Sequence, residues 1–353
     1  MVPVPAYDTY LSLTFPSLSV FLSTTSHLSL ISQTASSSHS LLVSVKTPST
    51  KSSPWSSTSP NSLPTTSSSS SSSSSSVPSP PPLALSPATL WLPLERSLAQ
   101  IYSVATQRFL RNGKVLATID VVLEEMREIP ICTPMGSNVI KWVYSDYSDS
   151  SSTTTPIVGE GGQGSFEVVA LGGTFDHLHA GHKILLTMAS SLATRKVIVG
   201  VSDDELLGKK QYREWLEGIK ERIEQVERFL ELVRPGVKHE VVPLKDVYGP
   251  TATDPDIQAL VVSEETRSGG DAINKLRSER SLSTLETFVI NLVSDDGSTT
   301  STVDGMVDEK GKDQGGKKTQ VKVAVETKMG STGIREWISR QEAGKRRHRS
   351  GDS

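Results

Sequence analysis

The stretch FEVVALGGTFDHLHAGH, which runs from Phe166 to His182, decides the fold of this chain. Its first part, FEVVALG, is mostly apolar and leads into Gly172 and Gly173, a pattern that predicts a buried strand. A helix is predicted from about Gly181 onward, because apolar residues recur there at helical spacing. A strand that passes through a glycine-rich turn into a helix is the first unit expected of an open α/β sheet.

The same alternation continues toward the C-terminus. Further strands are predicted at 196–202, 238–244, 257–263 and 285–292, and further helices at about 212–233, at about 270–277 and from about Ser331. This spacing predicts an α/β domain with a doubly wound parallel sheet, which we place at residues 165–343. Within it, residues 294–319 lack apolar periodicity, so we expect a flexible insertion there.

The rest of the chain is expected to contribute little ordered structure. Only 35% of the 353 residues are hydrophobic, and residues 1–94 include a run of ten serines at 67–76 but few charged side chains. We therefore expect 1–94 to be a disordered low-complexity tail. Residues 95–150 read as a small accessory α/β segment of unknown role, and residues 344–353 as a basic tail.

Composition excludes several classes of protein. The net charge of −3 lacks the basic excess of a protein that coats nucleic acid, so no nucleic-acid partner is expected. The single cysteine, Cys132, excludes an intrachain disulfide framework and fits a reducing compartment. No apolar run reaches the ~18 residues of a membrane span. No Lys or Arg precedes Lys46, which disfavours a targeting signal; we expect a cytoplasmic location and leave nuclear or mitochondrial association open.

The turn from Gly172 to His182 is where we expect the chemistry. Ligands of open α/β sheets bind outside the carboxyl ends of the strands, and a helix N-terminus attracts anions. His179 and His182 are three residues apart at that helix start, so both imidazoles can face one phosphoryl group. The alternatives are a pair of capping histidines without function and a metal site. The metal site is disfavoured because the H-x-G-H spacing differs from the i, i+4 pair of metalloproteases.

GGTFDHLHAGH resembles the T/H-x-G-H signature of the nucleotidyltransferase superfamily. Three further blocks come after it in order: GVSDDELLGKK at 200–210, VVSEETRSGGDAINKLR at 261–277 and KMGSTGIR at 328–335. With all four, the chain resembles the eukaryotic, fungal-type monofunctional phosphopantetheine adenylyltransferases of coenzyme A biosynthesis. The resemblance implies a Rossmann-like fold and transfer of AMP from ATP to 4'-phosphopantetheine, giving dephospho-coenzyme A and pyrophosphate.

The resemblance also assigns roles to residues. The catalytic residues would be His182, at the α-phosphate, His179 and Lys209. ATP would be bound by Gly172, Gly173, Phe175, Gly181, Ser331, Thr332 and Arg335. Phosphopantetheine would be bound by Thr174, Asp176, Lys210, Ser263, Glu264 and Arg277, and which of Lys209 and Lys210 holds the acceptor phosphate stays open. Mg²⁺ would enter with ATP without a protein metal site, and other coenzyme A biosynthesis enzymes are the expected protein partners.

Two rival functions share much of this pattern. A cytidylyltransferase acting on phosphocholine-type substrates carries the same GTFDxxHxGH signature, but usually also an R-T-x-G-I-S-T pattern that this chain lacks. A non-catalytic scaffold of a coenzyme A synthesis complex could keep the fold alone. The intact His179, His182, Lys209 and Arg335 favour an enzyme.

Overall fold

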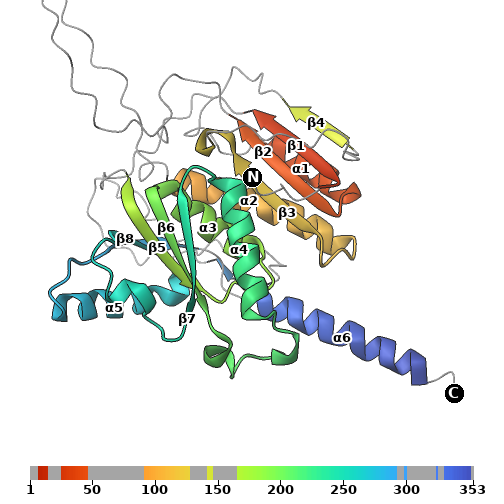
Figure 1. Cartoon of the computed structure of the whole chain (residues 1–353). Helices are drawn as coiled ribbons and strands as arrows, with labels where there is room; N and C mark the ends of the chain where they lie inside the picture. The colour runs from red at the N-terminus through yellow and green to blue at the C-terminus, as the bar shows by residue number, and fades with distance from the viewer. Residues whose placement is uncertain are drawn as a thin grey trace, which may run out of the picture.

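The computed structural model describes residues 7–14, 25–46, 91–127, 141–145, 165–291, 298–299, 323–324 and 330–350. They form two α/β units, each built around its own sheet (Figure 1). The N-terminal unit lies before residue 146 and the C-terminal unit begins at residue 165. Helix α2 of the first unit packs against helix α3 of the second, so the two units share an interface.

The C-terminal unit is a five-stranded parallel sheet in the order β7-β6-β5-β8-β9. Its main elements are β5 (Phe166–Gly173), α3 (Ala180–Leu192), β6 (Ala193–Ser202), α4 (Ile219–Val233), β7 (Lys238–Leu244), β8 (Ala259–Ser263), α5 (Arg267–Glu279), β9 (Glu286–Ile290) and α6 (Ser331–Ser350). The predicted doubly wound parallel sheet is confirmed. Chain order reverses on either side of β5, and such a switch point is where ligands bind in this class of sheet.

Two predicted helix boundaries in this unit are wrong. The helix expected from residue 212 begins at Ile219, because Tyr212 adopts a left-handed conformation (φ 53°) and residues 213–215 form a separate turn of 3₁₀ helix. The basic cluster at 345–349 is not a separate tail, since α6 continues through it to Ser350.

The structure of the N-terminal unit contradicts part of the prediction that residues 1–94 are a disordered tail. Its elements are β1 (Thr9–Thr14), α1 (Thr25–Ser37), β2 (Ser40–Lys46), α2 (Trp91–Arg111), β3 (Thr118–Leu123) and β4 (Lys141–Ser145). The strands form one parallel sheet in the order β3-β2-β1-β4. The prediction of a disordered tail over 1–94 is therefore wrong for residues 9–14, 25–46 and 91–94. Residues 95–150 are no separate segment either, because β3 and β4 complete this sheet.

Hydrogen-bonded hydroxyl groups explain why this unit folds despite its composition. Ser38 is fully buried, and its Oγ donates to Thr9 Oγ1 and lies 2.8 Å from Thr34 O. Between such residues, Leu11, Leu41 and other strand residues are fully buried. Parallel sheets are covered on both faces, so few charges are needed in their strands. The serine run at 67–76 lies outside the described residues.

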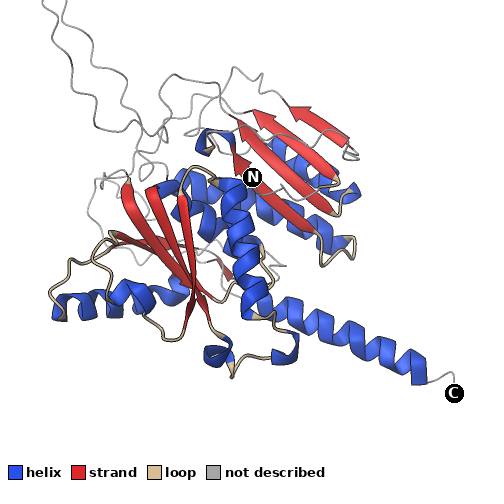
Figure 2. Ribbon diagram, viewed as in Figure 1, coloured by secondary structure: helices blue, strands red, loops and turns tan. Residues whose placement is uncertain are grey.

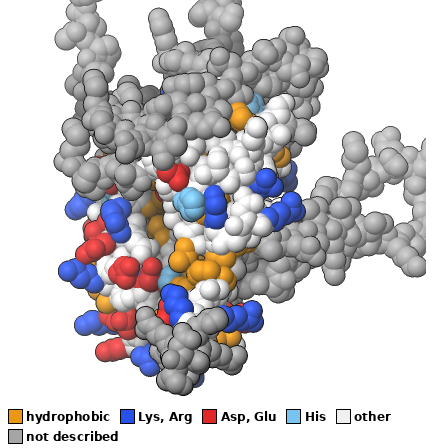
Figure 3. Space-filling view, turned by 90° about the vertical axis from the view of Figure 1, so that its right-hand side faces the viewer, with side chains coloured by type: hydrophobic (Ala, Val, Ile, Leu, Met, Phe, Trp, Pro, Cys, Tyr) orange, Lys and Arg blue, Asp and Glu red, His pale blue; other side chains and the backbone are white. Residues whose placement is uncertain are grey.

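The expected insertion at 294–319 is described only at Ser298–Thr299, which form β10 and pair antiparallel with β11 (Val323–Ala324). Figure 2 shows that helices flank both larger sheets. On the face shown in Figure 3, Lys and Arg side chains are interspersed with Asp and Glu side chains around a group of hydrophobic side chains. Among the described helices, none has the length and apolarity to cross a membrane.

Candidate active site

The turn between β5 and α3 has an unusual backbone. Phe175 and His177 both have positive φ angles, 51° and 46°, which side-chain-bearing residues rarely adopt. Phe175 is fully buried, and its ring centroid lies 5.2 Å from that of His182. A Cβ at Gly173 would lie 3.1 Å from the Phe175 ring, so this position favours glycine. The turn is thus packed into one shape beneath the predicted catalytic histidine.

His179 and His182 meet at the start of α3, as predicted. His179 is the N-cap residue, and its Nδ1 accepts a hydrogen bond from Gly181 N at 3.2 Å. The two imidazole rings are stacked, with centroids 3.9 Å apart. The buried Nδ1 of His182 has no hydrogen-bond partner among the described residues. His182 is therefore the member of the pair with a free polar atom, whereas His179 also caps the helix.

Both histidines are held in the neutral form. Burial lowers the pKa of His179 to about 4, helped by the positive charges of Lys183 and His177. Burial also lowers the pKa of His182 well below its ordinary value, with contributions from His179 and Lys210. A neutral imidazole offers one N–H donor and one acceptor. Lys209 and Lys210 are both exposed, and which of them holds the acceptor phosphate stays a prediction.

Asp176 has a structural role that corrects its assignment to phosphopantetheine binding. Its side chain is fully buried, and Oδ1 accepts a hydrogen bond from Glu217 N at 2.9 Å. Oδ2 forms an ion pair with Arg335, and the backbone oxygen accepts from Ser331 Oγ at 2.9 Å. Asp176 therefore joins the motif turn to the start of α6 and has no surface left for a substrate.

Arg335 is the partner of Asp176 in this ion pair. It is 1% exposed, and besides Asp176 it donates to Gln211 O at 3.0 Å and to Thr332 Oγ1 at 3.1 Å. Its guanidinium therefore orients the first turn of α6. Ser331 and Thr332, half-buried in that turn, lie beside the motif as predicted. Their contact with ATP phosphates stays a prediction, as does that of Arg335.

Sequence reasoning missed Arg222, which organises the loops around the motif. It is fully buried on α4, and its Nη1 donates to Thr174 O at 2.8 Å and to Ser202 O at 2.7 Å. Its Nη2 lies 2.5 Å from Asp204 Oδ1. The ends of β5 and β6 are thus held together by one guanidinium. The sequence pattern could have indicated a buried arginine, because Arg222 lies on the otherwise apolar face of its helix, one turn after Ile219.

The block after β8 lies at the carboxyl edge of the sheet, but its residues are engaged with one another. Ser263 N donates to Thr266 Oγ1 at 3.1 Å and starts a short helical turn. Glu264 is exposed and lies 3.5 Å from Arg267. Both Ser263 and Glu264 remain accessible at this edge, and their binding to phosphopantetheine stays a prediction.

Arg277 corrects its assignment to substrate binding. It is fully buried, and its Nε donates to Ser283 O at 2.6 Å. Its Nη1 donates to Thr251 O at 2.7 Å and to Asp254 O at 2.9 Å. The guanidinium therefore satisfies backbone carbonyls of two loops and has no surface that a substrate could reach.

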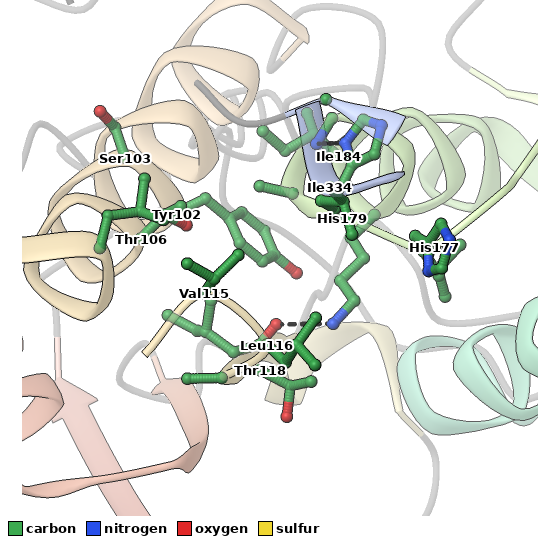
Figure 4. A pocket seen from close by; sticks show the side chains of 18 of the residues that line it. Tyr102, Ser103, Thr106, Val115, Leu116, Thr118, His177, His179, Ile184 and Ile334 are labelled. Carbon is green, nitrogen blue, oxygen red and sulfur yellow. Dashed lines mark hydrogen bonds between the residues drawn. The ribbon is translucent and has the colours of Figure 1, made fainter. Parts of the chain in front are cut away.

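A cavity of about 360 Å³ adjoins the motif at the interface of the two units. In Figure 4, His177, His179 and Ile184 form one side, and Tyr102, Ser103 and Thr106 of α2 face them across the space. Val115 and Leu116 close it from the loop before β3, Thr118 from the start of β3, and Gly330 and Ile334 from the start of α6. Pockets of this size with apolar walls and a few polar groups suit small organic ligands. The sequence could not reveal it, because its walls are far apart along the chain.

The described residues contain no group of three His, Cys, Asp or Glu side chains placed to hold a metal ion. The acidic residue of the turn, Asp176, is fully engaged with Arg335 and Glu217 N. A divalent cation at this site would therefore need most of its ligands from the substrate and water, as is usual for Mg²⁺.

Comparison with known proteins gives matches of three kinds: a family model, curated relatives and a solved structure. A family model described as cytidylyltransferase-like matches residues 170–333. The phosphopantetheine adenylyltransferase of Saccharomyces cerevisiae is 33% identical over 217 residues, covering 57% of this chain and 71% of that protein. The phosphopantetheine adenylyltransferase of Methanopyrus kandleri is 40% identical over 147 residues, covering 41% of this chain and 92% of that protein. A solved structure of a protein of unknown function from Archaeoglobus fulgidus is 33% identical, covers 35% of this chain and 87% of its own, and has a TM-score of 0.31.

Proposed function

The chain belongs to the phosphopantetheine adenylyltransferase family, and on this premise we propose that it transfers AMP from ATP to 4'-phosphopantetheine, giving dephospho-coenzyme A and pyrophosphate. One observation carries the proposal: the stacked, neutral His179 and His182 at the N-terminus of α3, with the unpartnered Nδ1 of His182. A polar atom buried without a partner is costly, and a phosphoryl oxygen would satisfy it.

The reaction needs positioning and charge stabilisation more than proton transfer. A phosphate oxygen of 4'-phosphopantetheine attacks the α-phosphorus of ATP, and the bond from that phosphorus to the bridging oxygen of pyrophosphate breaks. The acceptor phosphate is already ionised near neutral pH, so no general base is required. His182 donates a hydrogen bond to the α-phosphate, where charge grows in the transition state. The N–H groups at the start of α3 favour the same charge.

Different residues at the carboxyl edge of the sheet bind each of the two substrates. Thr174 and either Lys209 or Lys210 hold the acceptor phosphate; the charge of Lys210 acts on His182. Ser331 and Thr332 receive the β- and γ-phosphates at the N-terminus of α6. The ion pair between Asp176 and Arg335 keeps that helix against the motif. Mg²⁺ would enter as part of the MgATP substrate and would neutralise negative charge on its phosphates.

The cavity beside Gly181 and Gly330 is the described space best suited to the adenosine of ATP. It begins at the two helix starts proposed for the phosphates, and Leu116, Ile184 and Ile334 line it with apolar surface. A purine base is flat and largely apolar on its faces, so it fits such walls. Hydroxyl groups of α2 lie across the cavity and can bind its polar edge.

For the cell, we propose a cytoplasmic enzyme that works beside other enzymes of coenzyme A biosynthesis. The single cysteine supports a reducing compartment. The product, a dephosphorylated coenzyme A, requires a kinase to become the finished cofactor, so a phosphotransferase is the natural neighbour.

The test is pyrophosphate release by the purified full chain with magnesium, ATP and 4'-phosphopantetheine. A parallel mixture contains CTP and phosphocholine, and a third contains the His182→Ala variant. Release in the first mixture alone is the expected result. Release of pyrophosphate with CTP and phosphocholine would indicate a cytidylyltransferase. No release in any mixture, from folded protein, would indicate a scaffold. Either result contradicts the proposal.

A further inference from the structure

A buried polar cluster joins the two units directly beside the catalytic turn. Lys183 Nζ lies 2.8 Å from Asp120 Oδ1 of β3 and donates to Ile119 O at 2.9 Å. Tyr7 Oη donates to the other carboxylate oxygen, Oδ2, at 2.7 Å. Lys183, Asp120 and Tyr7 are only 6%, 8% and 5% exposed. The cluster is therefore an ion pair removed from water, with hydrogen bonds from both units.

The lysine of this pair is placed where it can control the motif. Lys183 directly follows His182, and its backbone N donates to His179 O at 3.0 Å in the first turn of α3. A side chain anchored to β3 therefore fixes the rotation of the turn that carries both histidines. The ammonium charge of Lys183 also helps to lower the pKa of His179, after burial itself.

Stability alone is a poor explanation for the pair. A buried ion pair often gives no more stability than apolar residues of the same shape, because desolvation offsets the attraction. Apolar burial already joins the two units, because Tyr102 of one and Leu186 of the other belong to the same buried hydrophobic cluster. Buried polar groups can instead select one arrangement of two packed elements, since other arrangements leave a charge unpaired.

The smaller archaeal relative sharpens the question of what the N-terminal unit adds. The 147 residues matched in Methanopyrus kandleri make up 92% of that protein, which leaves too few residues for a second unit of this kind. Residues 7–145 are thus an addition to the catalytic fold in this chain. An addition that contacts the residue after His182 is placed to affect the reaction.

We propose that the N-terminal unit sets the position of His179 and His182 through the ion pair between Asp120 and Lys183, which makes these two residues positioning residues for adenylyl transfer. The inference rests on the proposed function for its kinetic effect. The structural effect of the ion pair on the two histidines does not depend on the proposed function, because it is measurable without substrates.

The experiment compares Asp120→Asn and Lys183→Met with a matched interface variant, Arg234→Met, all in the full chain. Arg234 is also buried and also crosses the interface, where its Nη1 donates to Met126 O at 2.8 Å, but it lies just beyond the C-terminus of α4. The readouts are kcat, KM for each substrate, the melting temperature, and NMR titration of the imidazoles without substrates. Besides Lys183, His177 acts electrostatically on His179, and His179 and Lys210 act on His182.

We expect Asp120→Asn to lower kcat by about 10- to 100-fold with little change in either KM, because misplaced catalytic groups lose rate more than binding. Lys183→Met should do the same and also raise the pKa of His179, since a like charge is removed. Arg234→Met should lower the melting temperature and leave kcat and the titration of His179 and His182 unchanged; only His239, whose pKa Arg234 affects, should shift. If a single variant does not fold, the double variant Asp120→Asn/Lys183→Met, which buries no unpaired charge, serves in its place.

An unchanged kcat and an unchanged imidazole titration in folded Asp120→Asn or double variant would overturn the inference. So would an equal loss of kcat in Arg234→Met. If the unaltered protein releases no pyrophosphate, the proposed function fails separately. The NMR titration then decides: shifted signals of His179 and His182 in Lys183→Met and Asp120→Asn, absent in Arg234→Met, support positioning, and unshifted signals of these two residues contradict it.

Discussion

The two units of this chain share a strand order and differ in the residues that come after their first strand. In each sheet the third, second, first and fourth strands of the unit lie side by side, β3-β2-β1-β4 and β7-β6-β5-β8. β5 ends on Gly172 and Gly173, and the chain continues with Asp176 and three histidines. After β1 it continues with FPSLSVFLST at 15–24, which has no glycine, histidine or charge. The same architecture therefore supports chemistry in one unit only, because function depends on the residues of the turn.

The units also differ in how they satisfy buried polar groups. The C-terminal unit buries Arg222, Arg277 and Arg335, and each guanidinium ties loops together through backbone carbonyls or a carboxylate. The N-terminal unit relies mostly on hydroxyls such as those of Ser38 and Thr9. The first strategy holds loops in fixed positions around a site, whereas these hydroxyl contacts join elements within their own unit.

The largest expected effect is a loss of catalytic rate when a histidine of the C-terminal unit, but not one of the N-terminal unit, is replaced. His182→Ala should lower kcat for pyrophosphate release by about 10²- to 10³-fold, because one preorganised donor to the transition state is lost. The matched variant in the other unit is His39→Ala, whose imidazole is 76% exposed. It should keep full activity. Circular dichroism of both variants should match that of the unaltered protein, and equal kinetic losses would contradict the assignment.

The next effect tests whether the N-terminal unit is as folded as its partner. Leu11→Ala and Leu186→Ala each remove a fully buried leucine, one from each unit. Each should lower the free energy of unfolding by about 2–5 kcal/mol, as cavity-forming core substitutions do. Denaturant titration measures both, with the exposed Ser26→Ala as control. A negligible effect of Leu11→Ala would restore the disordered tail suggested by composition.

A smaller effect tests the cavity between the units. Leu116→Trp places a bulky ring at its exposed wall and should raise KM for ATP by about tenfold, or about 1.4 kcal/mol of binding. KM for 4'-phosphopantetheine should stay within twofold, by the same rough scale. Leu92→Trp, at an exposed site of α2 outside the cavity lining, is the control. Equal changes in both KM values would place the adenosine elsewhere.

The smallest effect concerns pH. The pKa of His179 lies at about 4 in the folded protein and near 6.5 when unfolded, mainly because of burial. Between these values the unfolded chain binds more protons, so the free energy of unfolding falls as pH drops through this window. His179→Asn keeps an acceptor for Gly181 N and removes the titration. Denaturant unfolding at pH 7 and pH 5 should show a smaller loss in the variant; an equal loss would contradict the lowered pKa.

Periodicity was enough to predict the C-terminal sheet, because FEVVALG and the later runs alternate with amphipathic helices. The motif spacing likewise placed His179 and His182 together. The roles of Asp176 and Arg277 could not be predicted, since an isolated motif does not show which charged groups become buried against the chain itself. The N-terminal sheet was missed because buried serines and threonines have the composition of a disordered tail, and only their tertiary hydrogen bonds separate the two.

The most direct test of the central claim is phosphorus NMR of the full chain with MgATP and 4'-phosphopantetheine. The account predicts that the phosphomonoester signal of 4'-phosphopantetheine is replaced by two coupled signals of a diphosphate diester, with free pyrophosphate appearing in equal amount. Formation of ADP or inorganic phosphate as the primary product, or an unchanged phosphomonoester signal in the presence of folded protein, would contradict it.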